Sequence, residues 1–323
     1  MARLSRAVFI PNICPLMSPV AQTISAPLPR GDADQVDLSV IVPMYREALR
    51  VGPTLDDIIQ TLSRGLPGPD QRPLAAEVIL VDDGSPDDTI PVVTPRLTEQ
   101  PSGHLLHIRL VRHPHNRGKG AAVRTGLAAA AGDWRLIMDA DNACRVDQAA
   151  CLLGRAAPGV GLVAGSRVAP GAQVQARPFR KLSGLLFKLA LLPLGLNLLK
   201  DTQCGFKLYR ADLARIIAEQ ASENGYAFDL EHLLFTRAAG LTAEEVGVRW
   251  THMDGGQVRP VRDGLKMLRE GVRLRRGWSA RARQIPRLPA SLPMQRPRPS
   301  PAARPEIVVR PHATHPAAAR SGT

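Results

Sequence analysis

Two aspartates one residue apart, Asp139 and Asp141, come directly after an apolar run at 136–138. Such a run is typical of a buried strand, and alternate residues of an extended chain point to the same side, so we expect both carboxylates to leave the sheet edge together. Two carboxylates this close need a cation, and Mg²⁺ or Mn²⁺ would bind both and keep positions open for diphosphate oxygens. Taken alone, an aspartate that caps the next turn explains the pair equally well.

A second acidic pair, Asp82 and Asp83, ends the apolar run at 77–83. A carboxylate at the end of a buried strand must find hydrogen-bond donors, and the base and the ribose hydroxyls of a nucleotide supply them. Aspartate is also favoured at turns. We interpret the pair as nucleotide contacts in preference to turn residues.

A glycine-rich segment, Gly118-Lys119-Gly120, stands where a helix is expected to begin. The free amides and the dipole at a helix start favour anions, so the segment resembles a phosphate-binding turn. It matches neither a P-loop nor a dinucleotide-binding motif, and an ordinary glycine-rich helix start is an equal interpretation. We expect the neighbouring His113 and His115 to face solvent in a loop.

Short β-branched runs, expected as buried strands, alternate with longer segments that are expected as helices. The strands are expected at 39–43, 77–83, 107–111, 134–139 and 160–165, and the helices between them at 54–64, 87–98, 118–131 and 147–156. Further on, we expect helices near 211–221, 227–239 and 261–277 and a strand near 244–250. The alternation predicts an α/β domain with a mostly parallel central sheet and helices on both faces. Ligands bind at the carboxyl ends of the strands in such sheets, where the acidic pairs lie.

The excess of positive charge is concentrated at the carboxyl end of the chain. Residues 279–323 hold eight arginines and one glutamate, so they carry +7 of the net charge of +13. The remaining charge is spread widely and the motifs are acidic, which disfavours a nucleic-acid partner and favours anionic lipid. We expect a disordered leader at 1–36, one catalytic domain at 37–278 and a disordered Pro/Arg/Ala-rich tail at 279–323.

The cysteines and the apolar stretches indicate the compartment. The four cysteines contain no C-x-x-C pair, which disfavours a zinc knuckle or a disulfide framework and fits a reducing cytoplasm. No uncharged apolar stretch reaches eighteen residues, as a membrane span requires. We therefore expect a cytoplasmic protein that lies peripherally on the cytoplasmic face of a membrane.

An apolar stretch with basic flanks, at 177–200, is the first candidate for that membrane contact. It could lie in a bilayer interface with its basic ends on lipid phosphates, or form a buried helix broken at Pro193, and the two interpretations have nearly equal weight. The basic helix expected at 261–277 favours the membrane.

Seven motifs, taken in order, resemble those of the family 2 glycosyltransferases. More narrowly, they are similar to those of the dolichyl-phosphate β-glucosyltransferases and their prokaryotic polyprenyl-phosphate relatives. The motifs are VIVPMYRE at 40–47, VILVDDGSPDDT at 78–89, NRGKGAAVRTG at 116–126, RLIMDADNA at 135–143, AGSR at 164–167, DTQCGFKLY at 201–209 and YAFDLEHL at 226–233. The resemblance implies a GT-A fold, UDP-glucose as the donor, and an inverting transfer of glucose to a polyprenyl phosphate at the membrane surface.

The resemblance also implies a role for each site residue. The uridine would be held by Pro43, Tyr45, Glu47, Asp82 and Asp83. Lys119 would lie near the donor phosphate, and Asp139 and Asp141 would hold the metal. The donor sugar and the acceptor phosphate would be lined by Arg167, Gln203, Cys204 and Gly205. Asp229 and Glu231 are the remaining acidic candidates.

The chemistry of the acceptor limits what the catalytic residues must do. A lipid monophosphate is already anionic at neutral pH, with a second pKa of about 6, so no strong general base is required. We assign Arg167 and Arg180 to the acceptor phosphate, and Asp229 as an orienting residue or an optional base. Alternatives are GDP-mannose as the donor or a soluble acceptor, and, in a different class, a basic nucleic-acid-binding protein. The oligomeric state is not predicted.

Overall fold

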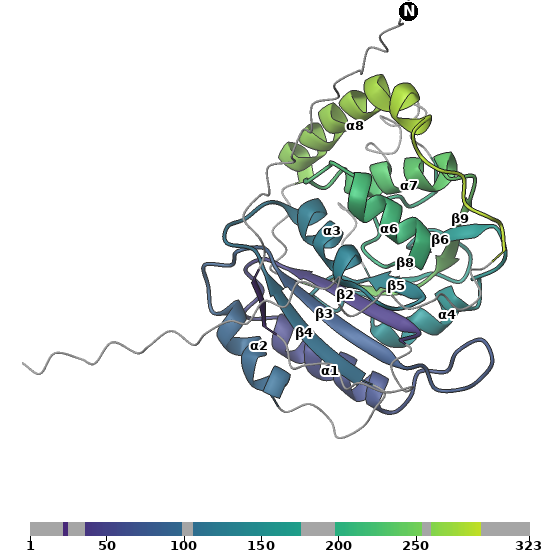
Figure 1. Ribbon diagram of the computed structural model, residues 1–323. Coiled ribbons are helices and arrows are strands. Elements are labelled where there is room, and N and C mark those ends of the chain that lie inside the picture. The colour runs from purple at the N-terminus through teal and green to yellow at the C-terminus, as the bar shows by residue number, and fades with distance from the viewer. Residues whose placement is uncertain (1–21, 25–35, 99–105, 176–197, 254–259, 292–323) are drawn as a thin grey trace, which may run out of the picture.

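The computed structural model describes residues 22–24, 36–98, 106–175, 198–253 and 260–291 (Figure 1). Its centre is an eight-stranded sheet with the strand order β1-β4-β3-β2-β5-β8-β6-β9, and β10 pairs with β7 in a second sheet. The strands are β1 Gln22–Ile24, β2 Leu38–Met44, β3 Ala76–Asp82, β4 Leu106–Arg112, β5 Trp134–Ile137, β6 Val160–Ser166, β7 Gln173–Gln175, β8 Lys207–Arg210, β9 Thr242–Gly247 and β10 Arg249–Thr251.

Most neighbouring strands of the large sheet run parallel, as predicted. The pairs β4/β3, β3/β2, β2/β5 and β6/β9 are parallel. β1 runs antiparallel to β4, and β8 runs antiparallel to both β5 and β6. The chain therefore has the predicted α/β architecture, with β8 as an inserted antiparallel strand.

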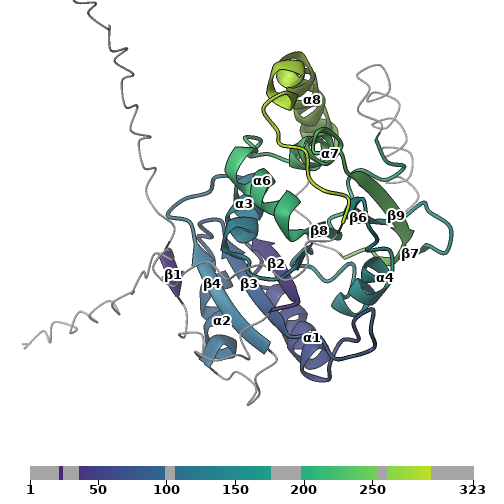
Figure 2. The same ribbon diagram turned by 45° about the vertical axis from the view of Figure 1, so that its right-hand side comes forward.

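Helices cover both faces of the sheet (Figures 1 and 2). One face packs against α1, α2 and α4, and the other against α3, α6 and α7, while α8 lies outermost beyond α7. The helices are α1 Val51–Ser63, α2 Thr89–Thr98, α3 Lys119–Ala129, η1 Val146–Gln148, α4 Ala149–Leu153, α6 Ala211–Gln220, α7 Phe228–Ala238 and α8 Pro260–Ala282. Within the described ranges, none of them combines the length and the apolar character that crossing a bilayer requires.

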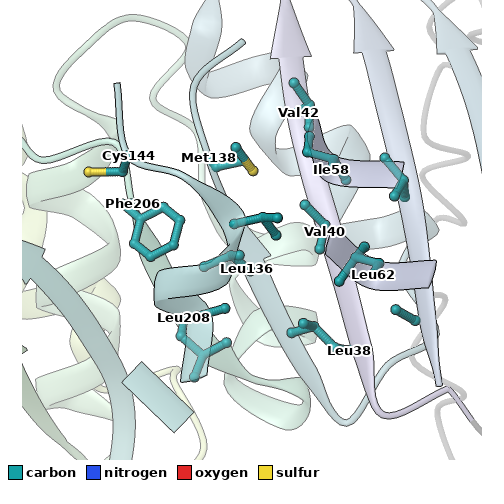
Figure 3. Close-up of a cluster of buried hydrophobic side chains, with 14 of the residues drawn as sticks. Leu38, Val40, Val42, Ile58, Leu62, Leu136, Met138, Cys144, Phe206 and Leu208 are labelled. Carbon is teal, nitrogen blue, oxygen red and sulfur yellow. The ribbon is translucent and has the colours of Figure 1, made fainter. Parts of the chain in front are cut away.

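The strand β2 shows why the central strands appear in the sequence as short apolar runs. Val40 and Val42 point to the same side and pack with Ile58 and Leu62 of α1 (Figure 3), whereas Ile41 packs on the opposite face with α3. Because both faces are buried, the strand is apolar at almost every position instead of at every second one.

Three strands, β1, β7 and β8, and one division of a strand were not predicted. β8 holds the buried side chains of Lys207 and Arg210, so its four residues lack the apolar run that marked the other strands. The strand expected near 244–250 is in fact two strands, because β9 ends at Gly247 and the following residues pair with β7 in the second sheet.

The predicted ends of the domain need correction. Helix α8 continues to Ala282, Ile285 is 5% exposed, and the backbone N–H of Leu288 donates to the carbonyl of Ala239 at 2.9 Å. The folded part therefore extends beyond 278, because these residues bury apolar surface against α7. Within the predicted leader, β1 pairs with β4. The remaining residues of both predicted disordered segments lie outside the described ranges, as does 176–197 of the predicted interfacial segment.

Three strand ends meet where the acidic segments begin. The central strands lie in the order β3-β2-β5, and Met44 at the end of β2 is in register with Asp82 at the end of β3. The backbone N–H of Met138 donates to the carbonyl of Ile41 at 3.0 Å, which keeps the segment after β5 beside β2. The acidic segments that follow β3 and β5 therefore lie at the same edge of the sheet.

Helix α3, which begins at the glycine-rich turn, is seated on the sheet through Gly126. A Cβ at this position would overlap with Cγ2 of Ile41 and lie 3.3 Å from Cγ2 of Val81. We expect Gly126→Ala to lower the melting temperature by several degrees, because overpacking costs about 1–3 kcal/mol and outweighs the gain of up to about 1 kcal/mol from better helix propensity. Gly277→Ala in α8 is the matched control, since its new methyl group would meet no atom within 4 Å. Equal melting temperatures for the two variants would contradict this packing.

Candidate active site

The predicted metal ligand Asp139 lies next to the predicted phosphate-turn residue Lys119. Nζ of Lys119 donates to Oδ1 of Asp139 at 2.5 Å, and the two side chains remain 28% and 36% exposed, respectively. Lys119 is the first residue of α3, and Gly118 before it has a φ of 101°, which favours glycine. The structure thus brings two predicted sites, from the segments after β4 and β5, to one point.

A third predicted segment, 201–205, packs against the carboxylate of Asp139. Gly205 packs so tightly against Asp139 that a Cβ at Gly205 would overlap with all three carboxyl atoms. The absence of a side chain at Gly205 therefore makes room for the carboxylate. Gln203 is half-buried, and its Nε2 is buried without a hydrogen-bond partner within the described part of the chain. Cys204 was expected to line the site, but its side chain is buried beneath the site surface.

The two aspartates have opposite pKa shifts. Burial raises the pKa of Asp139, but the charge and the hydrogen bond of Lys119 outweigh burial, and the net shift is downward. Burial also raises the pKa of Asp141, and the negative charge of Asp139 adds to the increase. Burial is the larger cause of the Asp141 shift, and the part that comes from Asp139 is like-charge repulsion, which a cation placed between the carboxylates would relieve.

The residues present fit a divalent cation that is only partly enclosed by protein. Asp141 accepts one hydrogen bond, from the backbone N–H of Ala143 at 3.0 Å, so part of its carboxylate remains available. In the described ranges, no cluster of three or more His, Cys, Asp or Glu side chains forms a closed metal cage. Two carboxylates with open positions are the set that Mg²⁺ and Mn²⁺ use beside phosphate groups.

The carboxylate of Asp83 holds the glycine-rich turn. Its Oδ1 accepts from the backbone N–H of Arg117 at 2.9 Å and its Oδ2 from that of Gly118 at 2.7 Å, while Nδ1 of His113 lies 2.7 Å from Oδ1. Nε2 of His113 lies 2.9 Å from Oγ1 of Thr125 in α3. The ends of β3 and β4 and the start of α3 are therefore joined through one carboxylate.

These contacts concern Asp82, Asp83 and His113, and they correct the interpretation of His113. Asp82 and Asp83 are 0% and 2% exposed, and Asp82 accepts hydrogen bonds from the backbone N–H of Ser85 and from Nε of Arg112. Donors for both carboxylates are thus supplied by the protein, which gives Asp82 and Asp83 a positioning role. Their contact with a nucleotide stays a prediction. His113 is 1% exposed and does not face solvent, whereas His115 is exposed as expected.

The segment after β2 is tied to the segment after β3. The backbone N–H of Arg46 donates to Oγ of Ser85 at 3.0 Å, and that of Glu47 donates to Oγ1 of Thr89 at 2.8 Å. These contacts fix the position of Tyr45, which is half-buried and carries the guanidinium of Arg46 at 5.3 Å from its ring centroid. Pro43 is buried within β2, so its side chain supports the predicted uridine site from below its surface.

Glu47 shares the electrostatic environment of the aspartates. Burial raises the pKa of Glu47 to about 7 against the opposing effect of Arg50, and the charges of Asp141 and Asp139 raise it further. Its carboxylate makes a two-point contact with Arg50 at 2.7 Å for each hydrogen bond. This contact fixes Glu47 near the carboxylates of Asp139 and Asp141.

Arg167 is oriented by a carboxylate of the 201–205 segment. Its backbone N–H and its Nε donate to Oδ2 of Asp201 at 2.9 and 2.7 Å, and its Nη2 donates to Oδ1 at 2.8 Å. The guanidinium also lies 5.6 Å from the ring centroid of Trp250. Its side chain is 32% exposed, so Arg167 can still reach an anionic ligand.

A buried lysine that the sequence did not single out lies behind the aspartates. Nζ of Lys207 donates to Oδ1 of Asp229 at 2.7 Å and to the carbonyl of Cys204 at 2.5 Å. Burial raises the pKa of Asp229, and the charge of Lys207 partly offsets the increase. Asp229 is 5% exposed, which fits the orienting role and disfavours a base that contacts the acceptor directly.

The loop between α6 and α7 packs on the glycine-rich turn. The backbone N–H of Gly120 donates to the carbonyl of Asn224 at 2.8 Å, and a Cβ at Gly118 or Gly120 would overlap with the loop backbone. Glu231 accepts hydrogen bonds from the backbone N–H groups of Ser222 and Glu223 at 3.0 and 2.8 Å. Glu231 is therefore a buried anchor of this loop and not a ligand at the site surface.

The predicted acceptor residue Arg180 lies outside the described residues. Nine of the other predicted residues form two groups. Around Asp139 the structure gathers Lys119, Gly205 and, through electrostatic coupling, Glu47, Asp141, Arg167 and Asp229. Asp82 and Asp83 lie beneath this group and hold the loops that carry it.

Comparison with known proteins gives the family that the sequence motifs resemble. Residues 39–217 match the family model described as glycosyl transferase family 2. The chain is 35% identical to the dolichyl-phosphate β-glucosyltransferase of Dictyostelium discoideum over 255 residues, which cover 76% of each protein. It is 30% identical to the human enzyme of that name, over 73% of this chain and 74% of that enzyme.

A solved structure shows the same fold. The glucosyl-3-phosphoglycerate synthase of M. tuberculosis superimposes with a TM-score of 0.52 at 21% identity, over 73% of this chain and 78% of that chain. That synthase has also been solved in complex with Mn²⁺ and UDP-glucose. The family match, the relatives and the arrangement of the sheet together establish that this chain belongs to glycosyltransferase family 2 and is a glycosyltransferase with the GT-A fold.

Proposed function

We propose that this glycosyltransferase moves glucose, with inversion, from UDP-glucose to a polyprenyl phosphate of the dolichyl type, and that it requires Mg²⁺ or Mn²⁺. The observation that carries the proposal is the meeting of Lys119, Asp139 and Gly205, which come from three distant motifs. Relatives that match this chain over about three quarters of their length are named dolichyl-phosphate β-glucosyltransferases.

The donor would bind along the edge formed by the ends of β2, β3 and β5. Tyr45 and Glu47 line the part of this edge assigned to the uridine, and Lys119 lies where the diphosphate would reach the aspartates. Asp139 and Asp141 would hold the divalent cation, which would stabilise the charge that develops on the departing UDP. The anionic diphosphate of the donor would give Lys119 a phosphate oxygen as a second partner.

The acceptor would be held by positive charge. A lipid phosphate is a nucleophile without prior deprotonation, so the protein must hold it in line with the sugar and offset its repulsion from the donor. Arg167 is fixed by Asp201 and remains a third exposed, which suits contact with the acceptor phosphate. Lys207 adds a buried positive charge, and Asp229 fixes the Nζ of that lysine.

The acceptor places the reaction at a membrane. A polyprenyl phosphate keeps its chain in the bilayer, so the site must reach the lipid surface. We propose that it does so on the cytoplasmic face.

The first experiment measures the transferred sugar and its acceptor. We expect the purified protein with Mn²⁺ and a polyprenyl phosphate to transfer labelled glucose from UDP-glucose into a chloroform-extractable product. GDP-mannose should give little product under the same conditions. A product that forms equally well from GDP-mannose would contradict the donor, and a label that enters only water-soluble material would contradict the acceptor.

A substitution in the aspartate pair tests the metal assignment. We expect Asp141→Ala to lower the rate of transfer by more than about 100-fold at saturating Mn²⁺, because several kcal/mol of leaving-group stabilisation would be lost. Asp88→Asn removes an exposed carboxylate away from the pair and serves as the control, with a rate close to that of the wild type. Full activity of Asp141→Ala would rule out this metal site.

The contact between His113 and Asp83 predicts an effect on the donor. We expect His113→Phe to raise the KM for the nucleotide sugar by about tenfold or more, because a buried carboxylate loses a donor and the Lys119 turn loosens. His113→Asn, whose amide can replace the donor at Nδ1, should restore most of the affinity. A lower melting temperature with an unchanged KM in His113→Phe would mean that the histidine serves only stability.

A further inference from the structure

Helix α8 has a buried face and an exposed face. Met267 and Leu274 are 8% and 7% exposed, Gly271 is buried and Trp278 is half-buried. The spacing of these residues by three and four places them on one side of the helix, against α7. Figures 1 and 2 show that α8 lies at the outside of the molecule, beyond α7, so its opposite face is directed away from the protein.

The exposed face is cationic. Exposed basic residues recur at the same spacing of three and four along the helix, as Lys266, Arg269, Arg273 and Arg276, and Arg275 is exposed beside them. Arg273 holds Glu223 with its Nη2 at 2.7 Å from the carboxylate. Among the side chains of α8 that the structure describes, Glu270 is the one acid, and it is 11% exposed, turned toward Gly225. Nζ of Lys266 lies 3.8 Å from the carboxylate of Glu270, so two of the five cations have acidic partners, and the net outward charge of the face is still positive.

A cavity of about 330 Å³ lies beside this face. Its lining combines two arginines, a serine hydroxyl and apolar side chains: Ser222, Arg273, Leu274, Gly277, Trp278 and Arg281. The arginines are held in place by Glu223 and Glu231. Tryptophan favours the boundary between water and hydrocarbon, and this lining suits a phosphate head group with the first part of its acyl chain.

The same helix is connected to the donor site. Arg273 and Arg281 of α8 hold Glu223 and Glu231, and both glutamates belong to or anchor the loop that packs on the glycine-rich turn. Lys119 follows directly in that turn. A surface bound to α8 would thus be linked to the site through ion pairs and backbone hydrogen bonds.

We propose that the cationic face of α8, defined by Lys266, Arg269, Arg273, Arg275 and Arg276, is the surface by which the protein docks on an anionic phospholipid membrane. The proposal rests on the proposed function, which requires the site to reach a bilayer. The charge alone would also attract nucleic acid, but the adjoining pocket with Trp278 and Leu274 matches a lipid better than a polynucleotide.

The test is binding of the full chain to phospholipid vesicles, measured by co-sedimentation without donor or acceptor. We expect binding to phosphatidylcholine vesicles that contain one third phosphatidylglycerol, weak binding to phosphatidylcholine alone, and release at high salt. The double variant Arg269→Gln/Arg276→Gln should bind the anionic vesicles about 30-fold more weakly, at about fivefold for each lost cation.

The control removes the same charge from the other side of the molecule. Arg64 and Arg155 are exposed and lie after α1 and α4, so Arg64→Gln/Arg155→Gln should bind as the wild type does. Equal losses in the two double variants, or equal binding to neutral and anionic vesicles, would overturn the proposal. Tighter binding to duplex DNA than to the anionic vesicles, lost in the α8 variant, would also overturn it.

Because neither nucleotide sugar nor polyprenyl phosphate is present, the vesicle result does not depend on the proposed reaction. Transfer to a detergent-dispersed acceptor by both double variants should equal that of the wild type. Intact vesicle binding without glucose transfer would contradict the proposed function and leave the docking surface standing.

Discussion

The arrangement of the site depends on the need of one buried carboxylate for hydrogen-bond donors. Asp83 stands at the end of β3 with 2% exposure, and a charge in such a place must be paired or hydrogen-bonded. It takes the backbone amides of Arg117 and Gly118 and the ring of His113. The chain that leaves β4 is thereby turned toward β3, α3 begins beside it, and Lys119 reaches Asp139.

This arrangement holds cations and carboxylates together in a way that suits anionic substrates. Lys119, Lys207 and Arg167 each have a carboxylate partner, in Asp139, Asp229 and Asp201 respectively. The pairs keep positive charge at fixed positions before any substrate binds. Fixed charges cost little reorganisation during a reaction, which suits the proposed transfer from a nucleoside diphosphate sugar to a lipid phosphate.

Much of the fold was predictable because its strands are buried on both faces and appear as unbroken apolar runs. The aspartates at the ends of β3 and β5 were found for the same reason. Lys207 was missed because β8 is short and carries two charged side chains, whose burial only the tertiary structure reveals. The sequence indicates that Asp83 needs donors, but whether they come from a nucleotide or from the turn at 117–118 depends on a loop path that no local pattern encodes.

The proposed function requires that the edge around Asp139 and Asp141 binds a uridine nucleotide together with a divalent cation. Thermal unfolding of the wild-type protein with UDP or GDP, each with and without Mn²⁺, tests it most directly, because a ligand of the folded state raises the melting temperature. The account predicts that UDP with Mn²⁺ raises the melting temperature, whereas UDP alone and GDP with Mn²⁺ raise it little. An equal increase with GDP, or an increase with UDP that does not depend on Mn²⁺, would contradict it.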